Sequence, residues 1–343
     1  MLMTEPLVIK ASGNSYDLGF TIGKAARKLL IRALRDYRQL LPAEGWPNGF
    51  TLPAGYLAAA RESYPHLVEE LQGMADGAGL DMNHLFFLNA LEEALDPHYP
   101  SACSSVGLID RQGKAWLGHN EDWYACDAKA VIVIFARPQG KPAFVSVTAA
   151  PFLAAVGLNE AGLAQGVNSV TSTDNRMGVP RMFLARAALE AETIEGAVKA
   201  ATSGNRAGGY NHLLVHRSGE LGNLETTAAE AVYTSGDLVT FHTNHYLAPG
   251  LQHLAEPASD HSLSRFSRLA AAKKELLDNN DPVGGITALL ADHKNRPFSI
   301  CRHREEQEDG SATIFSALFN ATDLKVWVAA GNPCGNILKE ITI

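Results

Sequence analysis

The chain has 343 residues, of which 46% are hydrophobic and 19% are charged, and its formal net charge is -8. A chain of this length and apolar content can bury a large core, which excludes a disordered protein. The acidic balance disfavours a nucleic-acid partner, and no apolar run approaches the ~20 residues that a membrane span requires.

Residues 1–100 are predicted to be mostly helical. Asn14 or Ser15 caps a long amphipathic helix, whose apolar stripe alternates with a basic face at helical spacing. We interpret that basic face as solvated surface. Pro65 is expected to interrupt the helical pattern that follows. In chain order, the predicted elements are a strand at 7–11 and helices at 15–41, 53–60, 67–75 and 81–95.

From Ser101 onward the sequence is rich in β-forming runs joined by short turns. Strands joined by short turns pair antiparallel, because parallel neighbours need a long crossover. Helical segments alternate with these strand groups, which predicts a layered α+β sandwich in a single domain of residues 1–343. The four strands between 213 and 242 are expected to form one meander. The predicted strands are 103–109, 115–118, 130–136, 144–147, 155–158, 163–167, 213–216, 221–226, 231–233, 238–242, 312–319, 326–330 and 338–343, and the helices are 180–191, 194–201, 260–277 and 282–292.

Two sequence patterns resemble ligand-binding motifs, one a phosphate-binding loop and the other a metal site. Gly19 and Gly23 precede Lys24 as in a phosphate-binding loop, but the glycine spacing is one residue short, so we predict that they serve helix packing. His242 and His245 lie at the end of a predicted strand without a carboxylate or thiolate beside them in the sequence, so no metal site is expected. No cofactor is predicted.

The cysteines and the N-terminus indicate the compartment. Four cysteines without a C-x-x-C pair are sparse for this length, which favours a reducing environment. The first residues lack a basic segment followed by an apolar run, so a cytoplasmic location is expected. Cys126, Cys301 and Cys334 match no catalytic pattern and are interpreted as structural.

The remaining cysteine, Cys103, stands where helical sequence gives way to strand sequence. Most free cysteines are small core residues. Here small residues flank the thiol, and the polar cluster 118–123 begins about sixteen residues later. A hairpin of that length would return residues 119–122 to Cys103. A thiol with a carboxylate and amides beside it is a candidate nucleophile.

At these residues the chain resembles the penicillin acyltransferase-like (acyl-coenzyme A:6-aminopenicillanate acyltransferase) family of N-terminal-nucleophile hydrolases. The motifs that carry the resemblance, in order, are the glycine-spaced helix, Ala102-Cys103-Ser104-Ser105, and residues 118–123, 157–163, 243–245 and 262–269. The resemblance implies an αββα four-layer sandwich of two mainly antiparallel sheets. It also implies a precursor that cuts itself between Ala102 and Cys103, giving chains 1–102 and 103–343.

The resemblance implies roles for several side chains. Cys103 is the nucleophile, Asn244 the oxyanion asparagine, and Arg265 the active-site arginine, with Arg268 as a competitor for that role. Cleavage frees an α-amine whose ordinary pKa of about 7.7–8.0 lets it act as the base for its own thiol. Asp122 is expected to hold the ammonium form. The predicted supporting residues are Asn120, Ser105 and Ser262.

Three functions remain open at this point. The first is an autoprocessed amidohydrolase or acyltransferase that cleaves or forms an amide C–N bond of a small N-acyl substrate through a Cys103 thioester. Its expected partners are a small-molecule amide, acyl-CoA or an amine acceptor, the other cleavage product as a heterodimer, and further copies in a homo-oligomer. The second is a papain-like hydrolase that pairs Cys103 with a histidine such as His119 and does not cut itself. The third is a non-catalytic sandwich that binds a small ligand.

Overall fold

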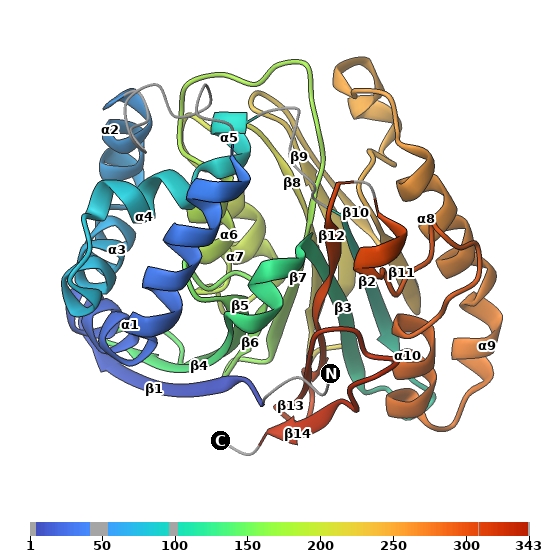
Figure 1. Cartoon of the computed structure of the whole chain (residues 1–343). Coiled ribbons are helices and arrows are strands. Elements are labelled where there is room, and N and C mark those ends of the chain that lie inside the picture. Colours follow the sequence, from blue (N-terminus) through green and yellow to red (C-terminus); the bar gives the residue numbers. More distant parts are fainter. Residues whose placement is uncertain (1–4, 42–53, 96–101, 308, 342–343) are drawn as a thin grey trace.

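The computed structural model describes residues 5–41, 54–95, 102–307 and 309–341. The predictions for Pro53, at the start of the helix expected at 53–60, and for the last two residues lie outside these ranges. Within them, two β-sheets are stacked face to face, and helices cover the outer face of each sheet (Figure 1). The predicted α+β sandwich with its αββα order of layers is therefore confirmed.

The larger sheet has eight strands and is antiparallel except for its first pair, β1 with β4, which is parallel. The smaller sheet has six strands, all antiparallel. In spatial order the strands of the larger sheet are β1 (Leu7–Gly13), β4 (Val131–Pro138), β5 (Phe144–Ala149), β6 (Gly157–Asn159), β7 (Leu163–Ser169), β8 (Tyr210–His216), β9 (Leu221–Thr226) and β10 (Ala231–Ser235). Those of the smaller sheet are β11 (Val239–His242), β2 (Ala102–Ile109), β3 (Ala115–Tyr124), β12 (Ser311–Asn320), β13 (Lys325–Ala330) and β14 (Lys339–Ile341).

The helices divide between the two outer layers (Figure 1). The layer on the larger sheet contains α1 (Ser15–Leu40), α2 (Ala54–Ser63), α3 (Pro65–Ala78), α4 (Met82–Leu88), α5 (Leu91–Leu95), α6 (Arg181–Ala188) and α7 (Ile194–Ala201). The layer on the smaller sheet contains α8 (Asp260–Ala271), α9 (Lys273–Asp278) and α10 (Pro282–Leu290). None of the helices in the described ranges has the length and apolar content needed to cross a bilayer.

Strand alternation divides the apolar core into layers. Successive side chains of β4 point to opposite faces, so Val133 packs between the two sheets and Ile132 packs under the outer helices α1 and α3. On the smaller sheet, Leu117 faces the space between the sheets, whereas Leu108 packs against α8 and α10. Each sheet is thus buried on both faces, as the four-layer order requires.

The glycines of α1 serve helix packing, as predicted. A Cβ on Gly19 or Gly23 would overlap the backbone carbonyl of Glu70 or Met74 on α3. Without side chains at these positions the two helices can approach to backbone contact. The cap at Asn14 is also confirmed, because its side chain accepts the backbone N–H of Asp17 at 2.9 Å.

Two predicted helices are each divided in the structure. The helix expected at 81–95 is interrupted at Asn89, whose side-chain amide donates to the carbonyls of Leu85 and Pro151 and accepts the N–H of Leu153. These hydrogen bonds stabilise a break in the helix at Asn89, which apolar periodicity alone does not predict. The helix expected at 260–277 is likewise divided into α8 and α9 at Ala272.

Two strand predictions are also corrected. The strand predicted at 115–118 continues to Tyr124, so the whole polar cluster lies within β3. The meander predicted from 213 to 242 holds for β8, β9 and β10, but β11 crosses to the smaller sheet and pairs with β2. Asn223 on β9 bridges the two sheets by donating to the Thr240 hydroxyl and the Phe241 carbonyl of β11. This crossing carries the residues after β11 to the N-terminal end of β2.

Candidate active site

The β2–β3 hairpin returns the polar cluster to the thiol, as predicted. Cys103 lies opposite Glu121, and Ala102 lies opposite Asp122. Because alternate strand residues face opposite sides, Cys103 and Glu121 face the larger sheet. Ala102 and Asp122 face the layer that contains α8.

The Cys103 sulfur is the first member of a chain of polar contacts. Its thiol donates to Glu121 Oε1 over 3.2 Å, and Glu121 Oε2 lies 3.2 Å from His119 Nε2. His119 Nδ1 in turn lies 2.9 Å from the Ser105 hydroxyl. Ser105 is therefore linked to the sulfur only through His119 and Glu121. The role of Glu121 was missed by sequence reasoning, although its position across the hairpin from Cys103 was the available signal.

Asn244 and Arg265 meet at the backbone of Cys103. The Cys103 N–H donates to Asn244 Oδ1 over 2.9 Å, and Arg265 Nη1 donates to the Cys103 carbonyl over 2.5 Å. Arg265 Nη2 also donates to Asn244 Oδ1, over 2.7 Å. Arg268, the competing arginine, forms an ion pair with Asp292 at 2.8 Å instead. The structure thus brings Arg265, and not Arg268, to the candidate nucleophile.

The turn that carries Asn244 is fixed by buried polar groups. Ser262 accepts the Asn244 backbone N–H over 2.8 Å, which gives this predicted supporting residue a contact with the site. The Asn244 side-chain amide donates to the Ser169 carbonyl over 2.9 Å. Two donors on Oδ1 and one acceptor at Nδ2 define the orientation of the amide group.

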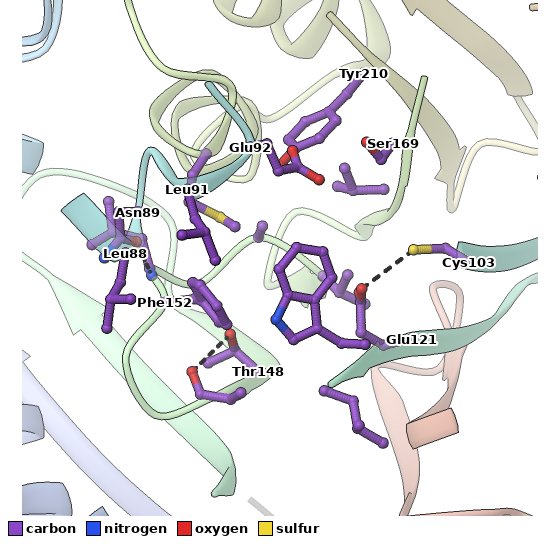
Figure 2. A pocket seen from close by; sticks show the side chains of 18 of the residues that line it. Leu88, Asn89, Leu91, Glu92, Cys103, Glu121, Thr148, Phe152, Ser169 and Tyr210 are labelled. Atoms are coloured by element: carbon purple, nitrogen blue, oxygen red, sulfur yellow. Dashed lines mark hydrogen bonds between the residues drawn. The ribbon is translucent and has the colours of Figure 1, made fainter. Parts of the chain in front are cut away.

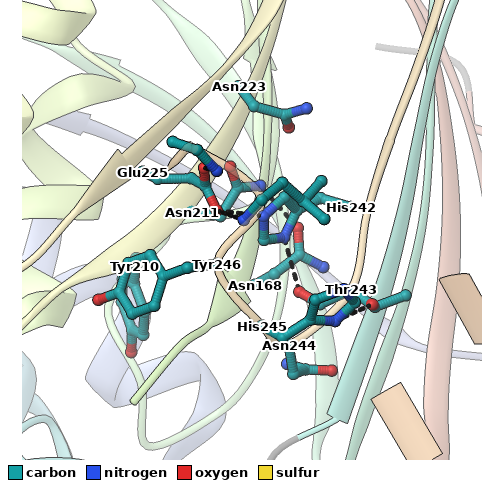
Figure 3. Close-up of polar contacts among 12 residues, drawn as sticks. Asn168, Tyr210, Asn211, Asn223, Glu225, His242, Thr243, Asn244, His245 and Tyr246 are labelled. Carbon is teal, nitrogen blue, oxygen red and sulfur yellow. Dashed lines mark hydrogen bonds and ion pairs between the residues drawn. The ribbon is translucent and has the colours of Figure 1, made fainter. Parts of the chain in front are cut away.

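Glu225 secures the same turn from the larger sheet. Its carboxylate accepts the backbone N–H groups of Leu247 and Ala248, each over 2.6 Å, and lies 3.0 Å from His242 Nε2. Figure 3 shows Glu225 beside His242, just before the turn that leads to Asn244. Although no carboxylate lies beside His242 in the sequence, the fold brings Glu225 to it from β9, which corrects the picture of an unpartnered histidine. His245 faces away from it and contacts Ser262 over 2.8 Å.

Asp122 is fully buried and lies opposite Ala102. Thr313 donates to its Oδ1 over 2.6 Å, while Oδ2 has no hydrogen-bond partner among the described residues. Burial raises the pKa of Asp122 to about 6, although the positive charges of Arg265 and Arg302 oppose that shift. A buried carboxylate oxygen without a partner can accept a new donor at low desolvation cost.

The intact chain keeps the Cys103 thiol protonated. Burial raises the pKa of Cys103 well above its ordinary value, and the negative charges of Glu121 and Asp122 raise it further. Arg265 opposes this shift, but burial also lowers the pKa of Arg265, to about 10. Since the thiolate is the reactive form, this sulfur needs a base before it can attack.

Asn120 lies apart from the thiol. Its amide donates to the carbonyls of Leu290 and Ile300, and the Ser316 hydroxyl donates to its Oδ1 over 2.5 Å. These contacts fasten β3 to the layer of α10. Asn120 therefore connects β3 to neighbouring elements and does not contact Cys103.

A pocket between the sheets opens onto Cys103 and Glu121 (Figure 2). The empty space between its lining side chains, including the part open to solvent, is about 710 Å³. Most of its lining is apolar, and its charged members among the described residues are the carboxylates Glu92, Glu93 and Glu121. Burial raises the pKa of Glu92 to about 7. Glu93 forms an ion pair with Arg181 at 3.0 Å.

Two groups of side chains within the described ranges have donor atoms close enough to share a metal ion. One consists of Cys103, His119 and Glu121. A metal ion there would occupy the sulfur that a thiol nucleophile must use. The other lies outside the pocket and includes Cys301 and Cys334.

Two solved structures show remote similarity to the chain. Penicillin V acylase from Agrobacterium tumefaciens is 16% identical with a TM-score of 0.46, covering 66% of this chain and 83% of that one. A mutant of conjugated bile acid hydrolase from Clostridium perfringens is 14% identical with a TM-score of 0.45, covering 70% and 97%.

Sequence comparison gives stronger similarities. The acyl-coenzyme A:6-aminopenicillanic-acid-acyltransferase 40 kDa form of Emericella nidulans is 28% identical over 352 residues, which cover 95% of this chain and 93% of that protein. Beta-alanyl-dopamine/carcinine hydrolase of Drosophila melanogaster is 28% identical over 220 residues, 56% of each chain. The family model for acyl-coenzyme A:6-aminopenicillanic acid acyl-transferase matches residues 109–334. Since this match spans well over half of the sequence, the chain belongs to the acyl-coenzyme A:6-aminopenicillanic acid acyl-transferase family.

Proposed function

We propose that this protein is a self-cleaving cysteine hydrolase of small amides, with Cys103 as its nucleophile. The observation that carries the proposal is the convergence of three groups on one residue. Asn244 binds the Cys103 N–H, Arg265 binds its carbonyl, and Glu121 accepts its thiol proton. A cysteine that serves only as a core residue has no need of this arrangement.

Self-cleavage would begin with attack of Cys103 Sγ on the carbonyl carbon of Ala102, while the thiol proton passes to Glu121. The C–N bond between Ala102 and Cys103 then breaks, and Glu121 returns the proton to the leaving nitrogen. This leaves the acyl group of Ala102 on the sulfur as a thioester. Water hydrolyses the thioester to an Ala102 carboxylate and a free Cys103 thiol with a new α-amine.

In the cleaved enzyme the new α-amine is the proposed base for the thiol. The partnerless Asp122 Oδ2 is suited to hold the ammonium form. The Asn244 amide donates one hydrogen to Ser169, and its second hydrogen is the proposed donor to the substrate oxyanion. Loss of one such donor typically costs about 2.7–4 kcal/mol in the barrier.

The pocket supports amide hydrolysis of a neutral or cationic substrate. Carboxylates line it beside apolar side chains, with no lysine, arginine or histidine among the described lining residues. Phosphate groups, such as those of an acyl-CoA, would find no cationic partner among these lining side chains. The name of the Drosophila relative, beta-alanyl-dopamine/carcinine hydrolase, also favours hydrolysis of a small amide by this chain.

The papain-like alternative is disfavoured by the placement of His119. The Cys103 thiol bonds to Glu121, and His119 bonds to the far oxygen of that carboxylate. A cysteine–histidine pair requires direct contact between thiol and imidazole.

Intact-mass spectrometry tests this proposal. Purified wild-type protein should contain two chains that meet between Ala102 and Cys103, and Cys103→Ala should give one uncut chain without turnover. Cys126→Ser is the control and should cleave normally. Wild-type protein should also hydrolyse an amide with a cationic end faster than its anionic analogue. An uncut wild-type chain with full activity would overturn the proposal.

A further inference from the structure

Two histidines and two cysteines from three segments lie close together at a site that is separate from Cys103 in the sequence. His293 follows α10, Cys301 and His303 lie between α10 and β12, and Cys334 follows β13. One donor atom from each lies within 4.8 Å of all the others. Cys301 is buried, the two histidines are partly buried and Cys334 is exposed, so an ion has a route from solvent.

Four distances between the donor atoms are within a few tenths of an ångström of those in a tetrahedral site, and the two between His293 and the sulfurs are below 4.8 Å. The two histidine Nε2 atoms are 3.0 Å apart, and the two sulfurs are 3.6 Å apart. His303 Nε2 lies 3.4 Å from Cys334 Sγ and 3.8 Å from Cys301 Sγ. Zn²⁺ bonds of about 2.0–2.3 Å in tetrahedral geometry place two nitrogens about 3.4 Å, two sulfurs about 3.8 Å, and a mixed pair about 3.6 Å apart.

Outer contacts orient these donors as metal sites usually require. The Asn332 amide lies 3.5 Å from Cys301 Sγ and donates to the Arg302 carbonyl over 2.6 Å. The second ring nitrogen of His303, Nδ1, lies 3.7 Å from Glu305 Oε1. That separation is too long for a hydrogen bond, so this exposed carboxylate places a negative charge near the ring without fixing its orientation.

We propose that His293, Cys301, His303 and Cys334 form a structural zinc site. Two thiolates and two imidazoles are a donor set that favours Zn²⁺, and four protein ligands leave no open coordination position for catalysis. The site would join the end of α10, the segment before β12 and the segment after β13. It was missed in the sequence because the four ligands follow no compact spacing, and His293 and Cys334 are 41 residues apart.

The proposed zinc site is also connected to Asp122 through Arg302 and Thr313. Arg302, between two of the ligands, donates its backbone N–H to the Thr313 hydroxyl over 2.9 Å. Thr313 donates to Asp122 over 2.6 Å. An ion that fixes the Arg302 segment would therefore help to position this carboxylate, and the zinc proposal itself holds whether or not the chain cleaves itself.

Two metal-free arrangements compete with this proposal. The imidazoles and thiols can hydrogen-bond to one another, and the two sulfurs are close enough to form a disulfide after a small movement. The cysteines are free in the structure. The zinc content of the protein and the presence or absence of a Cys301–Cys334 disulfide distinguish the zinc site from these two arrangements.

The test is elemental analysis of desalted protein produced in zinc-containing medium under reducing conditions. Wild-type protein should carry about one zinc per molecule, whereas Cys334→Ser and His293→Gln should lose most of it. Cys126→Ser and the exposed-histidine variant His253→Gln are matched controls and should keep it. Cobalt-substituted wild-type protein should show the visible bands of tetrahedral thiolate ligation.

Folded wild-type protein without zinc, or with a Cys301–Cys334 disulfide, would overturn the proposal. So would variants that retain the wild-type zinc content. If a variant fails to fold, the zinc content and the cobalt spectrum of wild-type protein still show whether the four side chains bind a metal ion. Neither measurement depends on cleavage or turnover.

Discussion

At the scale of single residues, Glu121 has two opposing effects on Cys103. Its negative charge raises the pKa of the thiol, which disfavours the reactive thiolate. Its Oε1 is also the nearest acceptor for the thiol proton, at 3.2 Å. The intact chain has no free α-amine at Cys103, so a base for the first cleavage must come from a side chain. Glu121 is in the position to supply it.

Glu121→Gln separates these two effects. Removal of the charge lowers the pKa of Cys103, so a purely electrostatic Glu121 predicts faster cleavage near neutral pH. Removal of a general base predicts cleavage slower by about 100-fold or more. We expect the slower rate, measured by intact mass at intervals after cell-free synthesis. Glu195→Gln, an exposed carboxylate on α7, should cleave at the wild-type rate.

At the scale of elements, the contact between α1 and α3 depends on glycine. Gly19 and Gly23 on α1 meet the backbone of α3, and Gly73 on α3 meets the Tyr16 carbonyl of α1. This close packing seals the outer face of the larger sheet over Ile132. The sequence predicted the packing role, but the partner helix and its register are visible only in the structure.

Gly23→Ala should destabilise the protein because the added methyl group overlaps the Met74 carbonyl. Overpacking of this kind costs about 1–3 kcal/mol, and displacement of a backbone sets the cost toward the upper end. Urea unfolding should show a lower midpoint for this variant. Gly250→Ala is the control, since its methyl group would meet only Val232 at an ordinary 3.6 Å. Equal midpoints for the two variants would contradict the packing argument.

At the scale of the whole molecule, the proposed cleavage would not divide the fold into independent parts. β1 belongs to the larger sheet, where seven residue pairs join it to β4. At the end of α1, the Tyr37 hydroxyl donates to Asp127 and accepts from Trp123 Nε1, each over 2.6 Å. Residues on both sides of the proposed cut therefore share one sheet and one buried network.

We expect chains 1–102 and 103–343 to co-elute in size-exclusion chromatography and to separate only in denaturant. Tyr37→Phe removes contacts that cross between them, so it should lower the urea concentration at which they part. Tyr16→Phe is the matched control, because its hydroxyl bonds to Asp76 within the first chain. Separation of wild-type chains in native buffer would disprove this prediction.

The sequence by itself determined the features that depend on neighbours along the chain. Alternation and helical periodicity predicted most elements and a layered α+β sandwich. The motifs around Cys103 and Asn244 indicated the family, and that resemblance implied the αββα order of layers. Only the tertiary structure decided which side chains meet across elements. The crossing of β11, the contact of Arg265 with Cys103, and the convergence of His293, Cys301, His303 and Cys334 all join distant segments. Such meetings are set by sheet register and packing, which local sequence patterns do not encode.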